Sequence, residues 1–158
     1  MNLLVGIYKE KKNEDFRMVI LPSGKNKIGL GKYKDYGIIS YLNKKNAKKI
    51  GELIFWALSE SDNEKIEDEV NVQWCKQYFN CSSNLKVVNE YNNIGFKFFE
   101  NKYKIYLKMK DGRGYSPFKD ENGNMVEYTF PEKPTALELG TKVMEMFEYK
   151  ERYDGLIE

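Results

Sequence analysis

The side chains able to carry out chemistry in this 158-residue sequence are few in kind, because it contains no histidine. Without an imidazole, histidine-based catalytic triads, HExxH zinc sites and proton transfer by histidine are excluded. Cys75 and Cys81 form neither a CxxC redox motif nor a zinc-binding pattern. A pair of carboxylates could share acid–base work, but no spacing selects one. We therefore expect no catalytic residue, no cofactor, no metal and no enzymatic activity.

Two glycine-containing stretches fall short of phosphate-binding motifs. The sequence GLGKYKDYG at 29–37 lacks the glycine spacing of a dinucleotide-binding loop, and no helix is predicted directly after it. The sequence LPSGKNK at 21–27 has a Gly-Lys pair but lacks the earlier glycine and the Ser or Thr of a phosphate-binding loop. We interpret LPSGKNK as the turn of a β-hairpin.

The clearest polar cluster is ESDNEKIEDE at 60–69, in which carboxylates surround a single lysine. At the start of a helix, these acids would simply complement the positive end of the helix dipole. As an exposed patch, they would face a basic partner and speed association. Both interpretations stay open. The candidate contact residues are Glu60, Asp62, Glu64, Glu67, Asp68 and Glu69, with Trp74, Tyr78 and Phe79 as nearby aromatic anchors.

A second candidate surface interleaves lysines with tyrosines, namely Lys25, Lys27, Lys32, Tyr33, Lys34 and Tyr36. Lysines can bind phosphates and tyrosines can stack on bases, so this pattern is compatible with nucleic-acid binding. In a lysine-rich chain, however, it more often marks a solvated strand face. Arginine, the better reader of phosphates and bases, occurs only at positions 17, 113 and 152. A small nucleic-acid-binding module is therefore the alternative function, not the preferred one.

The bulk properties indicate a folded protein with one domain spanning 1–158. Hydrophobic residues make up 41% and charged residues 32% of the chain, which argues against disorder. The net charge of +2 divides into +8 for residues 1–50 and −6 for residues 51–158. No stretch reaches the roughly 18 apolar residues of a membrane span, and the first apolar run is too short for a signal peptide. We expect a cytoplasmic protein.

Hydrophobic periodicity indicates the elements that must position these side chains. Alternating or short apolar runs predict strands at 3–8, 16–21, 27–33, 36–42, 93–99, 102–110, 115–118 and 125–130. Apolar stripes predict helices near 47–60, 64–79 and 136–150. Asp-Gly at 111–112 and Asn-Gly at 122–123 favour tight turns. The expected fold is α+β, with an antiparallel or mixed β-sheet flanked by about three α-helices.

The first and last predicted helices share one pattern, which suggests two similar strand-then-helix units and a weak internal repeat of 1–61 and 85–150. Aligning Ala47 with Ala136 also aligns Gly51 with Gly140. A glycine inside a helix costs roughly 0.5–1 kcal/mol relative to alanine. We therefore expect another backbone, of a sheet or of the other helix, to lie close to each glycine.

The order of these motifs resembles one group of immunity proteins of contact-dependent growth inhibition. The resemblance is carried by a strand-rich segment, by the A-x-x-[IL]-G-x-x-[IV] helix, by WCKQYF at 74–79, by GFKFFENKYKIYLKMKDGRGYSPF at 95–118 and by TALELGTKVMEMF at 135–147. It implies a small cytoplasmic protein that binds and neutralises the toxic C-terminal domain of a cognate toxin, often a nuclease. Inhibitors of nucleases are often acidic, whereas this chain is nearly neutral. The resemblance brings no catalytic residues.

Overall fold

The computed structural model describes residues 2–12, 14–66 and 74–158. In this part of the chain, eight strands form one antiparallel sheet, which confirms the α+β class. They are β1 (Asn2–Glu10), β2 (Phe16–Lys25), β3 (Gly31–Tyr33), β4 (Ile38–Leu42), β5 (Tyr91–Phe99), β6 (Lys102–Asp111), β7 (Gly114–Pro117) and β8 (Glu127–Phe130). The helices are α1 (Ala47–Glu60), α2 (Trp74–Gln77), α3 (Asn84–Glu90) and α4 (Ala136–Tyr153), and a 3-10 turn (Lys44–Asn46) precedes α1.

The sheet is built outward from its two central strands, β1 and β5, in which Gly6 lies opposite Gly95. Strand β2 pairs with β1 and carries β3 and β4 at its two ends. Strand β6 pairs with β5 and carries β7 and β8 in the same manner. Both halves therefore share one pairing scheme followed by a long helix, and we propose that they descend from the repeat expected at 1–61 and 85–150.

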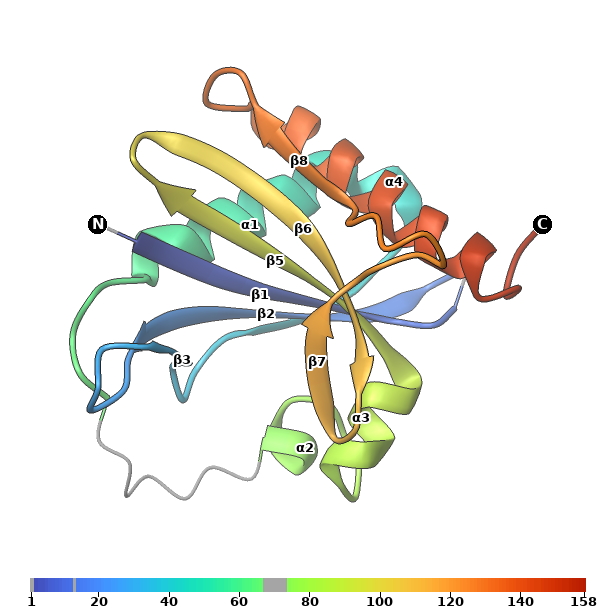
Figure 1. Cartoon of the computed structure of the whole chain (residues 1–158), viewed down its shortest axis with the longest axis horizontal. Helices are drawn as coiled ribbons and strands as arrows, with labels where there is room; N and C mark the ends of the chain where they lie inside the picture. Colours follow the sequence, from blue (N-terminus) through green and yellow to red (C-terminus); the bar gives the residue numbers. More distant parts are fainter. Residues whose placement is uncertain (1, 13, 67–73) are drawn as a thin grey trace.

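Helices α1 and α4 cover one face of the sheet, which we call the helical face (Figure 1). Inward-facing aliphatic residues alternate along the strands, so every second side chain meets the helices. Their partners form the stripe that the sequence predicted on each helix. The fully buried members of this core include Ile7, Ile20, Ile50, Ile54, Phe96, Ile105, Leu139, Val143 and Phe147. A capping box begins α4, because the Thr135 side chain accepts from the N–H of Glu138 and the Glu138 side chain accepts from that of Thr135.

The two helix glycines lie where α1 and α4 cross. A Cβ atom on Gly51 would lie 1.8 Å from the carbonyl oxygen of Ala136, and one on Gly140 would lie 1.7 Å from that of Ala47. The contact is reciprocal, since each glycine meets the first residue of the other helix. The close approach expected from the sequence is thus an approach to the other helix. The two backbones lie so close together that no side chain fits between them.

The opposite face of the sheet, which we call the open face, is only partly covered. Helices α2 and α3 pack against one end of it (Figure 1). This second core contains Tyr8, Val19, Leu21, Tyr78, Phe79, Cys81, Val87 and Tyr91. Helix α3 was not predicted. It begins after Ser83, whose hydroxyl accepts from the N–H of Lys86 and so satisfies a free donor of the first turn.

Three predicted elements are wrong in part. The helix expected at 64–79 is helical only at Trp74–Gln77 among its described residues, because Glu64–Ile66 is extended and pairs with Lys25. LPSGKNK is not a turn, since β2 continues to Lys25. The strand expected at 27–33 shrinks to Gly31–Tyr33, and the turn lies before it, where the Asn26 side chain accepts from the N–H groups of residues 28 and 30.

A buried ion pair joins the first strand to the last helix. Lys9 donates to Glu151 over 2.5 Å, and both side chains are almost fully inaccessible to solvent. The Lys9 ammonium also donates to the carbonyl oxygens of Glu10 and Lys12 and lies 4.4 Å from the centre of the Phe16 ring. All of its hydrogens therefore have partners, so the pair is a structural link. Among the described residues, no helix is long and apolar enough to cross a membrane.

Candidate functional site

The acidic segment predicted as a contact surface is organised around one lysine. Asp62 accepts from the Lys34 ammonium over 2.6 Å, and Glu60 accepts from it through its carbonyl oxygen over 2.7 Å. The hydrogen bond from Lys34 lowers the pKa of the Asp62 carboxyl, and a hydrogen bond from the Glu64 N–H acts in the same direction. Glu64 is exposed. Of the six predicted contact residues, Glu67, Asp68 and Glu69 lie outside the described residues.

An exposed aromatic pair adjoins these acids. The rings of Tyr36 and Trp56 meet edge to face at 6.4 Å, and they are 40% and 37% exposed. Lys34 lies 5.7 Å from the Tyr36 ring, which links the pair to Asp62. On α1, Trp56 stands one turn before Glu60, on the same side of the helix. We call Tyr36, Trp56, Glu60, Asp62 and Glu64 the aromatic–acidic patch.

The aromatic anchors proposed from the sequence lie elsewhere. Tyr78 and Phe79 are only 3% and 5% exposed, and Trp74 packs against Tyr33 and Tyr78 in the open-face core. The Tyr78 hydroxyl donates to the carbonyl oxygen of Asp35. These three side chains therefore support the fold, and Trp74 and Phe79 also line a pocket. Trp56 was not a candidate from the sequence, because it falls within the helix predicted near 47–60 and resembles a core residue beside the apolar stripe.

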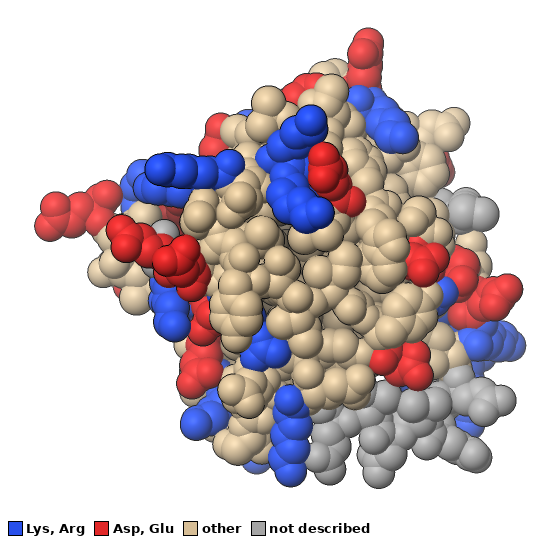
Figure 2. All heavy atoms as spheres, turned by 180° about the vertical axis from the view of Figure 1, so that it is seen from behind, with Lys and Arg blue, Asp and Glu red and all other residues tan. Residues whose placement is uncertain are grey.

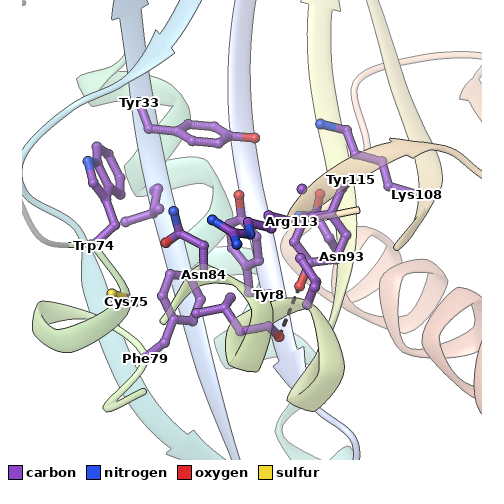
Figure 3. A pocket seen from close by; sticks show the side chains of 14 residues that line it. Tyr8, Tyr33, Trp74, Cys75, Phe79, Asn84, Asn93, Lys108, Arg113 and Tyr115 are labelled. Carbon is purple, nitrogen blue, oxygen red and sulfur yellow. Dashed lines mark hydrogen bonds between the residues drawn. The ribbon is translucent and has the colours of Figure 1, made fainter. Parts of the chain in front are cut away.

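The open face contains a cavity of about 300 Å³, which we call the open-face pocket (Figure 3). Its lining combines aromatic rings with two cations and two amides: Tyr8, Tyr33, Trp74, Phe79, Tyr115, Lys108, Arg113, Asn84 and Asn93, together with Leu21, Cys75, Val87, Val88 and Gly114. The residues come from several strands, from α2 and α3 and from the β6–β7 turn. Residues that are distant in the sequence therefore meet in this pocket, which explains why no local sequence motif predicted it.

The pair of central glycines makes room on the open face. A Cβ atom on Gly6 would lie 2.6 Å from the Tyr33 ring, and one on Gly95 would lie 2.3 Å from the Tyr106 ring. The tyrosine rings thus lie flat over the sheet where it has no side chains. Burial raises the pKa of Tyr33 to about 12, and burial raises that of Tyr106 as well. These phenols stay neutral at physiological pH, and the Tyr33 ring forms part of the pocket wall.

The remaining pocket residues set its electrostatics. Burial, followed by the charge and hydrogen bond of Tyr33, raises the pKa of the Tyr8 hydroxyl well above its usual value. Burial alone lowers the pKa of Lys108. The Tyr115 hydroxyl donates to the carbonyl oxygen of Tyr91 over 2.7 Å, which fixes this ring in the wall. The pocket therefore combines neutral aromatic walls with two cations, Lys108 and Arg113.

The alternative lysine–tyrosine surface does not form one face. Tyr33 turns into the open-face pocket, whereas Tyr36 packs against Trp56. Lys34 is engaged by Asp62, and Lys25 donates to the carbonyl oxygen of Asn2. The tyrosines and lysines are thus divided between two regions, so the stacking arrangement that favoured nucleic-acid binding is not assembled. Among the described residues, no group of three cysteine or carboxylate side chains lies close enough to hold a metal ion.

Comparison with known proteins identifies the fold. No protein-family model and no curated protein matches this sequence. Among solved structures, a protein of unknown function from Neisseria meningitidis superposes with a TM-score of 0.65 at 10% identity, covering 94% of this chain and 95% of that one. A chain of the CdiA-CT/CdiI toxin and immunity complex from Yersinia pseudotuberculosis superposes with a TM-score of 0.61 at 8% identity, covering 94% of this chain and 97% of that one. The shared feature is the fold over nearly the full length of all three chains.

Proposed function

We propose that this protein is a non-enzymatic, cytoplasmic immunity protein that binds and neutralises the toxic C-terminal domain of a cognate contact-dependent growth inhibition toxin. The observation that carries the proposal is the likeness, over 94% of the chain, to a chain of a toxin and immunity complex. The lack of histidine agrees with it, since inhibition by occlusion needs no reactive side chain. Such a protein acts by covering a surface of its partner.

The aromatic–acidic patch is the contact surface that we propose for the toxin. Interfaces draw most of their binding energy from a few aromatic or arginine anchors surrounded by polar residues. Trp56 and Tyr36 supply exposed rings, and Glu60 and Glu64 supply carboxylates beside them. Figure 2 shows that uncharged residues fill much of the molecular face seen from behind Figure 1, with charged side chains lying mainly towards its edge. A basic toxin surface would complement the carboxylates of the aromatic–acidic patch.

Co-expression with the toxin domain encoded beside its gene tests the function. We expect cells that produce both proteins to grow and the two proteins to elute together in gel filtration. Cells that die as readily with this protein as without it, together with separate elution, would refute the immunity function. A toxin domain from an unrelated system serves as the specificity control, and protection against it is not expected.

Charge reversal tests the contact surface separately. Changing Glu60 and Glu64 to lysine should slow association with the toxin domain about tenfold at low salt, because steering by opposite charges is lost. The matched control changes two acids outside the patch, Glu132 and Glu158, to lysine and introduces the same charge. Equal association rates for the two variants would remove the patch from the interface while leaving the immunity function intact.

A further inference from the structure

The open-face pocket holds two cations that lack an acidic partner among the residues that the structure describes. Lys108 lies within it, 5.6 Å from the centre of the Tyr106 ring, and Arg113 reaches it from the β6–β7 turn. Neither forms an ion pair with any residue of the described ranges 2–12, 14–66 and 74–158. Figure 3 shows the Arg113 guanidinium in the middle of the lining residues, among Tyr8, Tyr33 and Asn84. Cations directed at an aromatic cavity are suited to an anionic ligand.

One polar atom of the lining is buried without a partner. Asn93 is 1% exposed, and its amide nitrogen donates to the carbonyl oxygen of Ile7 over 3.0 Å. Its oxygen Oδ1 accepts no hydrogen bond within the described part of the chain. An unsatisfied buried acceptor costs about 1–3 kcal/mol. A ligand that brings an N–H or O–H group into the pocket would offset that cost.

The rest of the lining selects the shape of the ligand. Tyr8 is surrounded by Tyr33, Phe79 and Tyr115, with ring centres 6.2, 4.9 and 5.7 Å away. These rings contact each other edge to face and hold one another in place. They leave a rigid, largely apolar cavity of about 300 Å³, at the lower end of the range for small-molecule sites. A flat ring system fits such walls better than a branched aliphatic one.

We propose that the open-face pocket binds a small anion built on a planar aromatic ring, with the anionic group held by Lys108 and Arg113. The ring lies against Tyr8, Tyr33 and Trp74, and a donor on the ring reaches Asn93. Nucleotides and aromatic carboxylic acids share this chemistry. The site is separate from the aromatic–acidic patch, so ligand binding in the pocket can be tested independently of toxin binding.

The two tryptophans of the chain allow a direct binding assay, since one lines the pocket and the other lies in the patch. In the variant Trp56→Phe, the fluorescence reports on Trp74 alone. We expect saturable quenching when adenosine monophosphate, uridine monophosphate or 4-hydroxybenzoate is added, with excitation at the long-wavelength edge of the tryptophan band, where none of these probes emits. The variant Trp74→Phe, which reports on Trp56, should respond to none of them.

The probes separate the two sources of the ligand. Quenching by the nucleotides alone assigns the site to phosphate-bearing rings, and quenching by 4-hydroxybenzoate alone assigns it to aromatic carboxylates. Inorganic phosphate and uncharged uridine should each bind at least about tenfold more weakly than the nucleotides. Phosphate keeps only the contact with the cations, and uridine keeps only the contact of its ring with the aromatic walls. Absence of saturable binding for all three charged aromatic probes at millimolar concentration would overturn the proposal.

Substitutions in the pocket provide the second test. Arg113→Ala lies in an exposed turn, and Lys108→Met keeps the length of the side chain. Each should raise the dissociation constant of the bound probe about tenfold, since a charge-assisted hydrogen bond is lost. Lys102→Ala, which removes a charge at the other end of β6, should leave it unchanged. Equal affinities for Arg113→Ala and Lys102→Ala would contradict the proposal even if Lys108→Met failed to fold.

Discussion

The two faces of the sheet are built by opposite means. On the helical face, aliphatic residues of every central strand meet α1 and α4, and the helices touch through Gly51 and Gly140. On the open face, tyrosines, two amides, a lysine and an arginine surround a cavity, and Gly6 and Gly95 make room for rings. On the helical face, the glycines allow two helix backbones to touch. On the open face, the glycines leave space above the sheet that tyrosine rings occupy.

This difference separates stability from recognition. The helical face is closely packed and largely apolar, and among the described residues its one unpartnered buried polar atom is the side-chain nitrogen of Asn92, which does not line the open-face pocket. On the open face, the Asn93 side-chain oxygen has no hydrogen-bond donor and the two cations have no acidic partner within the described part of the chain. Such unpaired groups cost stability, so stability must come from elsewhere in the fold. We infer that the helical face carries the fold and the open face carries binding capacity.

The largest effect is expected at the helix crossing. Gly140→Ala places a Cβ atom against a backbone carbonyl that cannot rotate away, so α1 and α4 must separate. We expect the free energy of unfolding to fall by about 4 kcal/mol, above the ~1–3 kcal/mol typical of overpacking. Urea unfolding measures this change in the free energy of unfolding. Gly114→Ala is the matched control, because a Cβ atom there meets nothing closer than 4.0 Å, and it should change little.

A smaller effect is expected for the same substitution on the open face. Gly95→Ala places a Cβ atom 2.3 Å from the far end of the Tyr106 ring, which can swing away. We expect a loss of about 1–2 kcal/mol, and Tyr106→Leu should relieve part of it in the double variant. Urea unfolding of the four proteins gives the coupling. A loss as large as that of Gly140→Ala would show that both faces are equally rigid.

The smallest effect at neutral pH concerns the buried phenols. Burial raises the pKa of Tyr33 and of Tyr91 from 10.0 to about 12. The folded state therefore holds these protons more tightly than the unfolded state, and the resulting stability is complete below pH 10 and is lost between pH 10 and 12.

Urea unfolding across this pH range, together with tyrosinate absorbance, checks this expectation. Tyr33→Phe should flatten the alkaline fall in stability. The control Tyr41→Phe alters a side chain that is 73% exposed and should not flatten it. A fall in stability that is unchanged in Tyr33→Phe would show that the open-face phenol does not contribute.

Local patterns predicted the regular elements well. The helix at 47–60 has the bounds expected from its apolar stripe, and Gly112 and Gly123 adopt positive φ angles in the turns expected at Asp-Gly and Asn-Gly. The helix expected at 136–150 continues to Tyr153. These features depend on residues only a few positions apart, so a local sequence pattern is sufficient to predict them. The α+β class follows from their order.

Long-range pairing was not predictable from such signals. The spacing of Ile66 and Trp74 resembled a helix, yet Ile66 is held extended by its hydrogen bond to Lys25 across the molecule. Likewise, the Lys34–Asp62 ion pair and the pocket formed around Tyr8 join segments that no motif connects. Tertiary contacts overrode local preference at each of these positions. The acidic segment was identified, but its lysine partner and the neighbouring Trp56 were not.

The most direct test of toxin recognition through the aromatic–acidic patch is the equilibrium affinity between this protein and the toxin domain encoded beside its gene. Isothermal titration should give a one-to-one complex whose dissociation constant rises about thirtyfold for Trp56→Ala, equivalent to the loss of about 2 kcal/mol at an interface anchor. Leu137→Ala, an exposed apolar residue on α4, is the control and should bind like the wild type. Undiminished affinity of Trp56→Ala, or no complex with the wild-type protein, would contradict the account.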